Sequence, residues 1–467
     1  MFGQFACHDL VLTPTQSQVG NCCLSDATRR DFVNCLPIVV PSGDSFFGAG
    51  QCLEFKRATV FCDQRGAERY HINQLSAYAD GGHVYGSDPV TAAKLRLFSG
   101  GLLKVTSPGN LLPVVSGKFT GGDTRATENP ALATMHTIFM REHNRVAGLV
   151  AQKNPLLTDA EVFNHARRIV TAEMQNILFA EHLPLLIGTK SVFPPDQGFT
   201  TYDPKVDPSI TNEFSASSYR FGHTLANGFF YQNDPITGSS LGGYLLRTSN
   251  NNESTYSSNP DTGMTSIAKG MSLQAAQAHD RFVTQELTNF LYASNANNFA
   301  FGSDLAARNI QRGRDTGLSG WLHYRRLCYP HTSSSWNSRP NDISFTNWDK
   351  LSTLYTSVED IDLFTGSLAE DPVPTGTLGK TASCIVQQQF ESLIRGDRYF
   401  FTHRGNVGMS MTGEQIRAVR KVRMFDILCL NTNIRDLQRQ AFKIPMSIGN
   451  PLVPCLSAES IDVSLFV

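Results

Sequence analysis

The chain has 467 residues, of which 41% are hydrophobic and 17% are charged. Its formal net charge of −1 excludes bulk electrostatic attraction to nucleic acid or to an anionic membrane, and we expect neither as a partner. No apolar run reaches the roughly 18–20 residues that span a bilayer. The N-terminus lacks the basic and then apolar pattern of a signal peptide, and it reads as the middle of an element. We therefore expect that an N-terminal portion is missing from this chain.

Apolar residues at helical spacing predict long helices. In the first, Asn129 is the N-cap and Pro130 takes the first helical position. The second begins with the capping box Thr158-Asp159-Ala160-Glu161, which is worth about 1 kcal/mol, and Pro184 closes it. The predicted helices cover about 129–149, 158–184, 272–292 and 412–428.

Long irregular stretches separate these helices, and alternating strand patterns are few and short. Loops of this length are uncommon unless they are functional or cross-linked. We therefore predict a mostly α chain with very little β structure, forming one large domain over residues 1–467. The predicted irregular stretches are 13–70, 100–128, 190–215, 231–262 and 330–380.

Ten cysteines are many for a cytosolic enzyme of this size. No CxxC pair is present, which argues against a zinc ribbon or a thioredoxin-like motif. Five of the cysteines cluster early, at Cys22, Cys23, Cys35, Cys52 and Cys62, and four are widely spread, at Cys328, Cys384, Cys429 and Cys455. This distribution fits disulfide stapling of a secreted protein, with buried free thiols as the alternative.

Five motifs carry the chemistry of the chain: GQFACHDL at 3–10, SAYADGGHVYGS at 76–87, GDTRATENPALATMHTIFMREHNR at 122–145, SSYRFGHTL at 217–225 and ARNIQRGRDTGL at 307–318. Together, and in this order, they resemble the animal haem peroxidase family. The resemblance runs over essentially the whole chain, from Gly3 to Cys455. It implies that family's large, mostly helical fold with disulfide-stapled loops, a haem b cofactor and reaction with H₂O₂.

The distal residues are the first that the resemblance assigns. His8 is similar to the distal histidine, which takes a proton from the inner oxygen of peroxide and returns it to the outer one. Imidazole suits this role because its unperturbed pKa lies near 6.5. By the same match, Gln4 faces the cavity and helps to hold water or a halide. Arg125 is similar to the arginine that stabilises negative charge on the departing oxygen.

The proximal residues follow from the fourth and fifth motifs. His223 is similar to the axial ligand of the haem iron, and Asn309 to the asparagine that accepts the other N–H of that imidazole. Arg220 and Arg312 are candidates to pair with the haem propionates. Thr316 stands where the family usually has a histidine, and we expect little catalytic consequence.

The chain departs most from the family pattern at the residues that would attach haem covalently. Glu128 is similar to the glutamate that forms an ester to a haem methyl group. Cys7, however, occupies the place of the aspartate that forms the second ester. Haem is therefore held by one bond through Glu128, by none, or by a thioether to Cys7. We favour Cys7 as a small buried residue beside the haem.

The second motif resembles the calcium-binding loop of the family. Hard oxygen ligands on a loop tied to the distal helix suit Ca²⁺. Gly82 has no side-chain oxygen at a ligand position, so the site has lost one ligand or uses water. The calcium ligands implied by the resemblance are Asp9, Ser76, Tyr78 through its carbonyl, and Asp80.

The resemblance also implies a disulfide framework. Cys328 with Cys384, and Cys429 with Cys455, match two C-terminal disulfides of the family. The early cluster makes two more, using Cys35, Cys52 and one or both of Cys22 and Cys23, which leaves Cys62 over. We expect a secreted, extracellular protein.

The leading hypothesis is a peroxidase that oxidises phenols, tyrosine, halides or pseudohalides. One alternative is a fatty-acid dioxygenase of the cyclooxygenase type; another is a non-enzymatic adhesion or matrix protein that retains the fold. The tripeptide Arg395-Gly396-Asp397 could serve an integrin, but a structural turn is favoured because the family has a related sequence there. For His136 and His143, packing and hydrogen bonding are favoured over a metal site.

Overall fold

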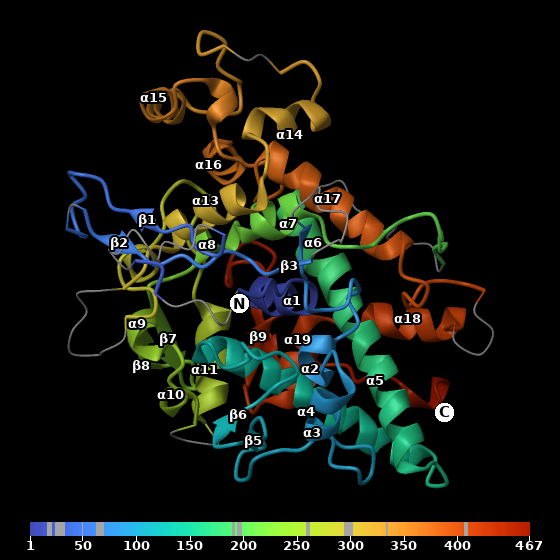
Figure 1. Ribbon diagram of the computed structural model, residues 1–467. Coiled ribbons are helices and arrows are strands. Elements are labelled where there is room, and N and C mark those ends of the chain that lie inside the picture. The colour runs from blue at the N-terminus through green and yellow to red at the C-terminus, as the bar shows by residue number, and fades with distance from the viewer. Residues whose placement is uncertain are drawn as a thin grey trace.

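The computed structural model describes residues 1–15, 21–23, 33–48, 50–61, 70–188, 192–193, 199–257, 262–293, 302–332, 335–405 and 410–467. Helix α1 (Phe2–Leu10) lies near the centre of the view in Figure 1, and longer helices surround it. The strands are short and form antiparallel pairs. The prediction of a mostly α fold with very little β structure is confirmed.

The helical elements after α1 are α2 (Gly82–Tyr85), α3 (Pro89–Leu95), α4 (Pro130–Lys153), α5 (Asp159–Asn176), the π-helix η2 (Ile177–His182), α6 (Leu183–Ile187), α7 (Asn212–Ala216), α8 (Gly222–Leu225), α9 (Leu246–Ser249), α10 (Ser254–Ser257), α11 (Gly263–Leu273), α12 (Gln285–Thr288), α13 (Leu305–Thr316), α14 (Trp321–Cys328), α15 (Phe345–Leu354), α16 (Leu363–Ala369), α17 (Lys380–Arg395), α18 (Gly413–Lys421) and α19 (Met424–Asn431). The strand pairs are β1 (Ile38–Val39) with β2 (Cys52–Leu53), β3 (Val60–Phe61) with β4 (Tyr70–His71), β5 (Val114–Val115) with β6 (Lys118–Phe119), β7 (Phe229–Asn233) with β8 (Ser240–Leu245), and β9 (Asp436–Gln438) with β10 (Leu452–Pro454).

The start signals of α4 and α5 act as the sequence predicts. The Asn129 side chain accepts a hydrogen bond from the Leu132 amide at 2.9 Å, and Pro130 opens the helix. At α5, the Thr158 amide donates to Glu161 Oε2 at 2.8 Å and the Glu161 amide donates back to the threonine hydroxyl. Both contacts satisfy amide donors that have no partner inside the helix.

Pro184 does not close the second helix, contrary to the prediction. Helix α5 passes into the π-helix η2, and the chain continues in α6 to Ile187. Pro184 lies in the first turn of α6, a position where the missing amide hydrogen costs little. The wider π turn thus lets a proline follow a long helix without ending the helical path.

The predicted helix 272–292 is wrong over most of its length. Helix α11 ends at Leu273, and only the short α12 is helical farther on. The Gln274 side chain bonds the backbone of β7 in both directions, donating to the Phe229 carbonyl at 2.8 Å and accepting from the Tyr231 amide at 3.2 Å. The Gln277 amide donates to Leu225 O at 3.0 Å. These tertiary contacts replace helical hydrogen bonds that the periodicity alone predicts.

The predicted helix 412–428 is divided into α18 and α19. Arg423 has extended backbone angles at the break. The freed backbone groups there bond to side chains of the preceding helices: Asn176 Nδ2 donates to Val422 O at 3.0 Å, and the Met424 amide donates to Glu181 Oε1 at 2.9 Å. Polar side chains therefore supply hydrogen-bond partners for the backbone groups at the break, and the two helices keep their apolar faces in the core.

All five predicted irregular stretches contain some regular structure, and the longer elements lie in 231–262 and 330–380. The β7–β8 hairpin, with α9 and α10 after it, lies within 231–262 or begins just before it. Helices α15 and α16 lie within 330–380, in the part of the chain at the top of Figure 1. Their apolar positions are too few to stand out as a helical pattern, and their packing on neighbours stabilises them.

Helix α4 is the central element of the core. It contacts α1, α2, α5, α11 and α19, and its buried residues run from Pro130 to Val150. One cluster of buried apolar side chains draws on the chain from Phe2 to Phe466. Helix α1 is therefore held on the side of α4 as part of the main core, which fixes the direction in which its polar side chains point.

Four disulfides join described cysteines: Cys22–Cys35, Cys23–Cys52, Cys328–Cys384 and Cys429–Cys455. The two C-terminal pairs and the use of both Cys22 and Cys23 agree with the expectation. Cys62 lies outside the described residues. The framework confirms the predicted stapling of the long loops.

The two N-terminal disulfides hold a strap, residues 33–61, which follows α1 in the chain and lies against α13. Asp315 of α13 accepts hydrogen bonds from Arg57 Nε at 2.6 Å and from the Ala58 amide at 2.8 Å. Gln311 Nε2, also on α13, donates to the Leu36 carbonyl at 2.8 Å. The strap thereby connects the region of α1 to a helix distant in sequence.

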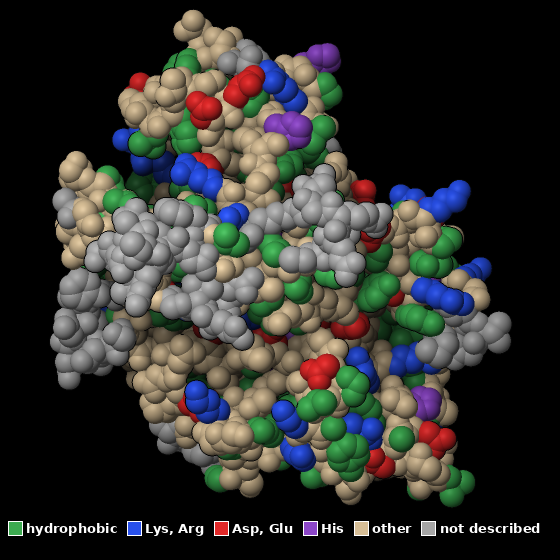
Figure 2. Space-filling view, viewed as in Figure 1, with side chains coloured by type: hydrophobic (Ala, Val, Ile, Leu, Met, Phe, Trp, Pro, Cys, Tyr) green, Lys and Arg blue, Asp and Glu red, His purple; other side chains and the backbone are tan. Residues whose placement is uncertain are grey.

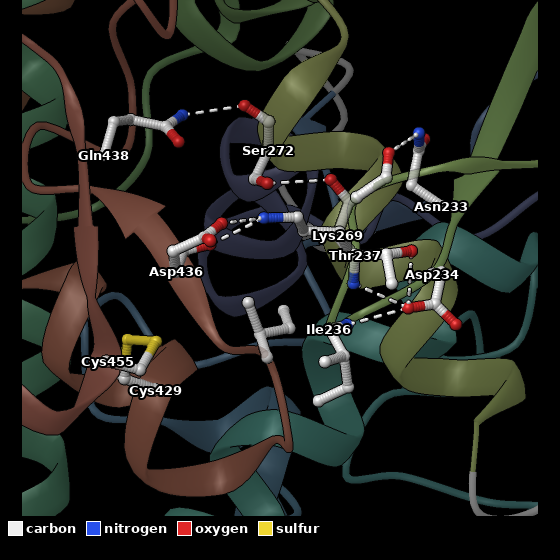
Figure 3. A network of polar contacts seen from close by, with 12 residues as sticks. Asn233, Asp234, Ile236, Thr237, Lys269, Ser272, Cys429, Asp436, Gln438 and Cys455 are labelled. Atoms are coloured by element: carbon white, nitrogen blue, oxygen red, sulfur yellow. Dashed lines mark hydrogen bonds and ion pairs between the residues drawn. A yellow bond between two sulfur atoms is a disulfide. The ribbon is translucent and has the colours of Figure 1, made fainter.

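The C-terminal strands are tied to α11 by a buried lysine. Figure 3 shows Lys269 Nζ directed at Asp436, where it donates to the carboxylate and to the backbone carbonyl, each at 2.6 Å. Gln438 Nε2 donates to Ser272 O at 2.7 Å nearby. The Cys429–Cys455 disulfide closes the same region. These contacts give the C-terminal part a fixed place against the core.

Basic and acidic side chains are interspersed over the described part of the face in Figure 2. Among the described residues, no helix is both long enough and apolar enough to pass through a bilayer.

Candidate active site

Helix α1 presents Gln4 and His8 on one face, because residues four apart lie one above the other on a helix. The His8 side chain is buried, with 3% of its surface exposed. Its Nδ1 lies 3.7 Å from Asp123 Oδ1, beyond hydrogen-bond distance, and has no hydrogen-bond partner among the described residues. Burial, helped by the charge of Arg125, lowers the pKa of His8 well below its usual value. The ring is therefore neutral at pH 7 and able to accept a proton.

Arg125 is fixed by Asp123, a residue that the sequence analysis did not single out. Its Nε and Nη2 donate to the two carboxylate oxygens of Asp123, each at 2.8 Å, and its backbone amide donates to the same group. The Asp123 side chain is fully buried. A bidentate pair of this kind sets the plane of the guanidinium. The Asp-Thr-Arg spacing was the available signal, since an aspartate commonly accepts from the amide two residues on.

Glu128 connects the distal helix to a tyrosine far along the chain. Gln4 Nε2 donates to Glu128 Oε2 at 2.9 Å, and the Tyr292 hydroxyl donates to Glu128 Oε1. Both carboxylate oxygens are therefore hydrogen-bonded. The sequence analysis predicted Gln4 and Glu128 but missed Tyr292, which follows α12 and carries no local motif.

The proximal histidine is held by α13. Asn309 Nδ2 lies 2.7 Å from His223 Nδ1, and Arg220 Nη1 donates to Asn309 Oδ1 at 3.1 Å. A half-turn of the amide places the oxygen of Asn309 against the same ring nitrogen. Burial, and then the charge of Arg220, lowers the pKa of His223 to about 3. The imidazole is thus neutral, with Nδ1 engaged and Nε2 without a hydrogen-bond partner among the described residues.

The two predicted propionate partners differ in their surroundings. Arg220 donates to the Ser215 carbonyl at 2.9 Å and to Asn309, and no carboxylate among the described residues pairs with it. Burial, and then the charge of Arg312, lowers the pKa of Arg220 to about 10. Arg312 already pairs with Asp315 at 2.6 Å. An added carboxylate would therefore be stabilised most strongly beside Arg220.

Cys7 lies where the distal and proximal groups approach each other. The charges of Arg125 and Arg220 both act on its thiol. Burial nevertheless raises the pKa of Cys7, so the thiol is protonated at neutral pH. A buried protonated thiol is a weak nucleophile. Cys7 is the only free cysteine among the described residues.

The predicted calcium ligands converge from two segments. Asp9 Oδ2 accepts from the Gly81 amide at 3.0 Å, and Asp80 Oδ2 accepts from the Ser76 hydroxyl at 3.0 Å. The same hydroxyl lies 3.4 Å from the Tyr78 carbonyl. Burial, and then the charge of Asp9, raises the pKa of Asp80. Two carboxylates that repel each other beside a hydroxyl and a carbonyl form an oxygen set suited to a hard cation.

Ser87 occupies the space that a side chain at position 82 would fill. A β-carbon built on Gly82 lies 2.7 Å from Ser87 Oγ and 3.1 Å from Asp80 Oδ1. The glycine thus allows a hydroxyl from five residues farther along the chain to approach the carboxylates. Sequence analysis recorded the missing oxygen at Gly82 but not this replacement.

Two buried histidines, His83 and His136, pack against the ring of Phe5 on the distal helix, and His83 was not predicted. Its Nδ1 lies 2.9 Å from Asp9 Oδ1, so it joins the calcium loop to α1. The ring centroid of His136 lies 5.6 Å from that of His83 and 6.2 Å from that of His8. Among the described residues, no three or more His, Cys, Asp or Glu side chains form a group that could hold a metal ion.

His143 is satisfied by ordinary hydrogen bonds. Its Nδ1 lies 3.1 Å from the Tyr85 hydroxyl and its Nε2 lies 2.9 Å from the Gly101 carbonyl. Both ring nitrogens are therefore engaged, as the preference for packing and hydrogen bonding requires.

The residues fit a haem group. A neutral imidazole with an unengaged Nε2 is a suitable axial ligand for iron. The guanidinium of Arg220, which has no carboxylate partner among the described residues, suits a haem propionate. On the distal side, the neutral imidazole of His8 lies near the guanidinium of Arg125, which Asp123 holds in place.

Comparison with known proteins agrees with this arrangement. The family model described as animal haem peroxidase matches residues 1–442. Peroxidase mlt-7 of Caenorhabditis elegans is 32% identical over 99% of this chain and 63% of its own length. Lactoperoxidase of Mesocricetus auratus is 32% identical over 99% of this chain and 68% of its own length. The chain therefore spans about two thirds of the curated relatives it matches.

Solved structures share the fold. Peroxidase A from Dictyostelium discoideum superposes with a TM-score of 0.79 and 26% identity, covering 94% of this chain and 85% of that one. A fatty acid alpha-dioxygenase of Oryza sativa has a TM-score of 0.74 and 18% identity, covering 95% of this chain and 76% of that one. At that identity the second likeness concerns the fold alone. From its matched length and its relatives, the chain belongs to the animal haem peroxidase family.

Proposed function

We propose that the chain is a peroxidase that reduces H₂O₂ and oxidises phenolic, tyrosyl, halide or pseudohalide donors. One observation carries the proposal: Cys7, next to His8 on α1, lies within reach of the charges of both Arg125 and Arg220, so the distal group of His8 and Arg125 and the proximal group of His223, Asn309 and Arg220 are neighbours in the fold. Haem b, the cofactor that family membership implies, supplies the redox chemistry when it is bound.

On the distal wall, His8 accepts a proton from the inner oxygen of peroxide and returns it to the outer oxygen. Its lowered pKa keeps the ring in the accepting form. Arg125, held in plane by Asp123, stabilises the negative charge that develops on the departing oxygen. Gln4, one turn from His8, holds water or a halide in the same space.

On the proximal wall, His223 would hold the iron through Nε2. Asn309 Nδ2 lies 2.7 Å from Nδ1; with the amide turned over, its oxygen would instead accept the ring's other hydrogen and fix the tautomer, and the contact of Oδ1 with Arg220 would be given up. Arg220 would pair with a propionate, and Arg312 would contribute its charge at longer range because it pairs with Asp315.

Covalent attachment through Glu128 is a prediction that mass spectrometry can decide. Both oxygens of that carboxylate accept hydrogen bonds, from Gln4 and from Tyr292. An ester would use one of the two oxygens and displace one of these donors, so the observed contacts favour a free carboxylate. The protonated thiol of Cys7 likewise favours the role of a packed side chain over a thioether.

A calcium ion completes the proposed site. Asp9, Ser76, the Tyr78 carbonyl and Asp80 would bind it, as the resemblance implies, and Ser87 would supply the oxygen that Gly82 lacks. The ion would neutralise the repulsion that raises the pKa of Asp80. We also propose secretion of the protein and folding of residues 1–467 as one domain; the four disulfides and the shared core support these two points.

A fatty-acid dioxygenase is the second candidate, and its support is weak because the rice enzyme shares only the fold with this chain. Oxygen uptake with linoleate, without added reductant, would support this alternative. Adhesion through Arg395-Gly396-Asp397 has less support. Arg395 pairs with Asp203 at 2.8 Å, and Asp397 is only 6% exposed, so the acidic end of the tripeptide is not accessible to an integrin.

The direct test is an absorption spectrum of the purified protein, followed by peroxide turnover with iodide. We expect a Soret band, and we expect His223→Ala to lose both the band and the turnover because the iron has no axial ligand. His331→Ala, at an exposed position, is the control and should behave as the parent does. Persistence of haem and turnover in His223→Ala would contradict the assignment.

A further inference from the structure

Tyr292 stands at the surface with its hydroxyl turned toward the distal wall. Its side chain is 49% exposed, while its hydroxyl donates to Glu128. The backbone has a φ of +54°, which is uncommon for a residue other than glycine and costs about 1 kcal/mol or more. Such a conformation persists only where surrounding contacts hold it, and here the Leu291–Ser303 bridge and the carboxylate contact do so.

The phenol is separated from the distal helix by a single carboxylate. Glu128 accepts from Tyr292 on one oxygen and from Gln4 on the other, and Gln4 is one turn from His8. The charges of Arg308 and Arg125 also reach the phenol. Solvent, Tyr292, Glu128 and Gln4 therefore form a continuous path from the outside of the molecule to the distal wall.

The pairing of a phenol with a carboxylate suits one-electron oxidation. A phenol that loses an electron becomes a strong acid, so the electron leaves easily only if a base already holds the hydroxyl proton. Burial, and then the charge of Glu128, raises the pKa of Tyr292, so the hydroxyl is protonated at neutral pH. Glu128 is the base in place, and its contact with Gln4 keeps it directed at the phenol.

We propose that Tyr292 is a surface oxidation site through which the enzyme oxidises tyrosines carried by other proteins. The proposal rests on the peroxidase function proposed above. In the first step, Tyr292 gives one electron to the cofactor that peroxide has oxidised and its hydroxyl proton to Glu128, leaving a neutral tyrosyl radical. In the second step, a donor phenol transfers a hydrogen atom to that radical, which restores Tyr292 and leaves the donor as a phenoxyl radical. The proton on Glu128 passes to the distal pocket before the next donor reacts, and two such cycles supply the two electrons and two protons that convert one H₂O₂ into two molecules of water.

Burial of the distal residues gives this route its substrate class. His8 is 3% exposed, so a tyrosine fixed in a folded protein cannot be brought against it. A large donor can instead reach the exposed edge of Tyr292, whereas an ion as small as iodide would be oxidised at the distal residues themselves. The structure thus assigns two donor classes to two places.

The test compares Tyr292→Phe with the parent enzyme, using a small folded protein with one surface tyrosine as the large donor and iodide as the small one. We expect the ratio of dityrosine formation to iodide oxidation to fall about tenfold or more, because the phenylalanine ring cannot pass on the hydrogen. A spin trap added with peroxide and no donor should label Tyr292, as peptide mass spectrometry would show, and the label should be absent from the variant. Tyr231→Phe is the matched control, since Tyr231 is also 49% exposed and its phenol contacts no carboxylate among the described residues.

Glu128→Gln keeps an oxygen that accepts from Tyr292 but removes the base. We expect it to lose the label at Tyr292 as well. Labelling at full yield in Glu128→Gln, or an unchanged donor ratio in Tyr292→Phe, would overturn the proposal while iodide oxidation by the parent continues. Absence of both haem and iodide oxidation in the parent would instead overturn the peroxidase function.

Discussion

On the distal wall the ring of His8 is packed in the core and Nδ1 has no hydrogen-bond partner within the described residues; on the proximal wall Asn309 lies 2.7 Å from Nδ1 of His223. On the distal side, hydrogen bonds hold the neighbours of the histidine in place: Asp123 holds Arg125, and Glu128 holds Gln4. On the proximal side, the hydrogen bond is made to the histidine ring itself. A group that must take up and release a proton gains from an unengaged ring, whereas a metal ligand gains from a fixed tautomer.

Among the variants that test this difference between the two histidines, Asp123→Ala should have the largest effect. Asp123→Ala removes both hydrogen bonds that hold the Arg125 guanidinium, so the rate of reaction with peroxide should fall by about 10²–10³, as stopped-flow absorption would measure. The free energy of unfolding should fall by about 3 kcal/mol because a partly buried cation loses its partner.

Asp362→Ala is the matched control for that variant, because Asp362 forms the same bidentate contact with the exposed Arg314. It should cost about 1 kcal/mol or less and leave the peroxide rate in place. Equal losses in the two variants would mean that Asp123 serves stability alone.

The proximal contact is tested by Asn309→Ala. Without a partner at Nδ1, the His223 ring loses its fixed tautomer, and the affinity for haem should fall about 10–100-fold. Titration of haem into cofactor-free protein would measure this change. Gln311→Ala on the same helix, which removes only a contact with the Leu36 carbonyl, should leave the affinity unchanged; a similar loss there would indicate damage to α13 as a whole.

The unengaged distal ring should show itself in the pH dependence. Burial lowers the pKa of His8, so the neutral form persists as pH falls through 6.5 and the rate with peroxide should stay nearly constant there. An ordinary imidazole would lose about tenfold per pH unit below its pKa. The same shift makes the folded protein less stable in acid. Above about pH 6.5, the pKa of the histidine in the unfolded chain, neither state binds the proton and the free energy of unfolding is unaffected. Below that pH only the unfolded state binds the proton, so the free energy of unfolding falls. A rate that halves near pH 6.5 would contradict the prediction.

The smallest effect should come from Cys7, where the two walls approach. Cys7→Ala removes a protonated, unpaired thiol, and the free energy of unfolding should change by about 1 kcal/mol or less. Acidified organic solvent should extract haem equally from parent and variant. Haem that stays with the parent and leaves the variant would reveal a thioether.

Local signals predicted the parts of the molecule that depend on local contacts. The caps at Asn129 and Thr158 fixed where α4 and α5 begin, and four-residue spacing placed Gln4 beside His8. The helix predicted over 272–292 failed because Gln274 bonds to β7, a contact that no periodicity reports. The disulfide pairs and the proximal roles came from resemblance to a family, not from the residue pattern.

The site residues that were missed are those whose partners lie far along the chain or within an apparent turn. Tyr292 meets Glu128 only in the folded chain, and Ser87 reaches the calcium loop only because position 82 has no side chain. His83 looked like part of a turn, yet it lies against Asp9. Sequence patterns indicate where an element begins more readily than they indicate what its exposed end will touch.

The strap over residues 33–61 links maturation of the protein to its thiol chemistry. It comes after α1 in the chain, is joined to Cys22 and Cys23 by the Cys22–Cys35 and Cys23–Cys52 bonds, and is hydrogen-bonded to Asp315 on α13, the helix that also carries Asn309. Both faces of the cofactor cleft thus depend on one oxidised segment. A chain made in a reducing compartment would assemble either face but would hold them together poorly, so oxidative folding becomes a condition for retaining the prosthetic group.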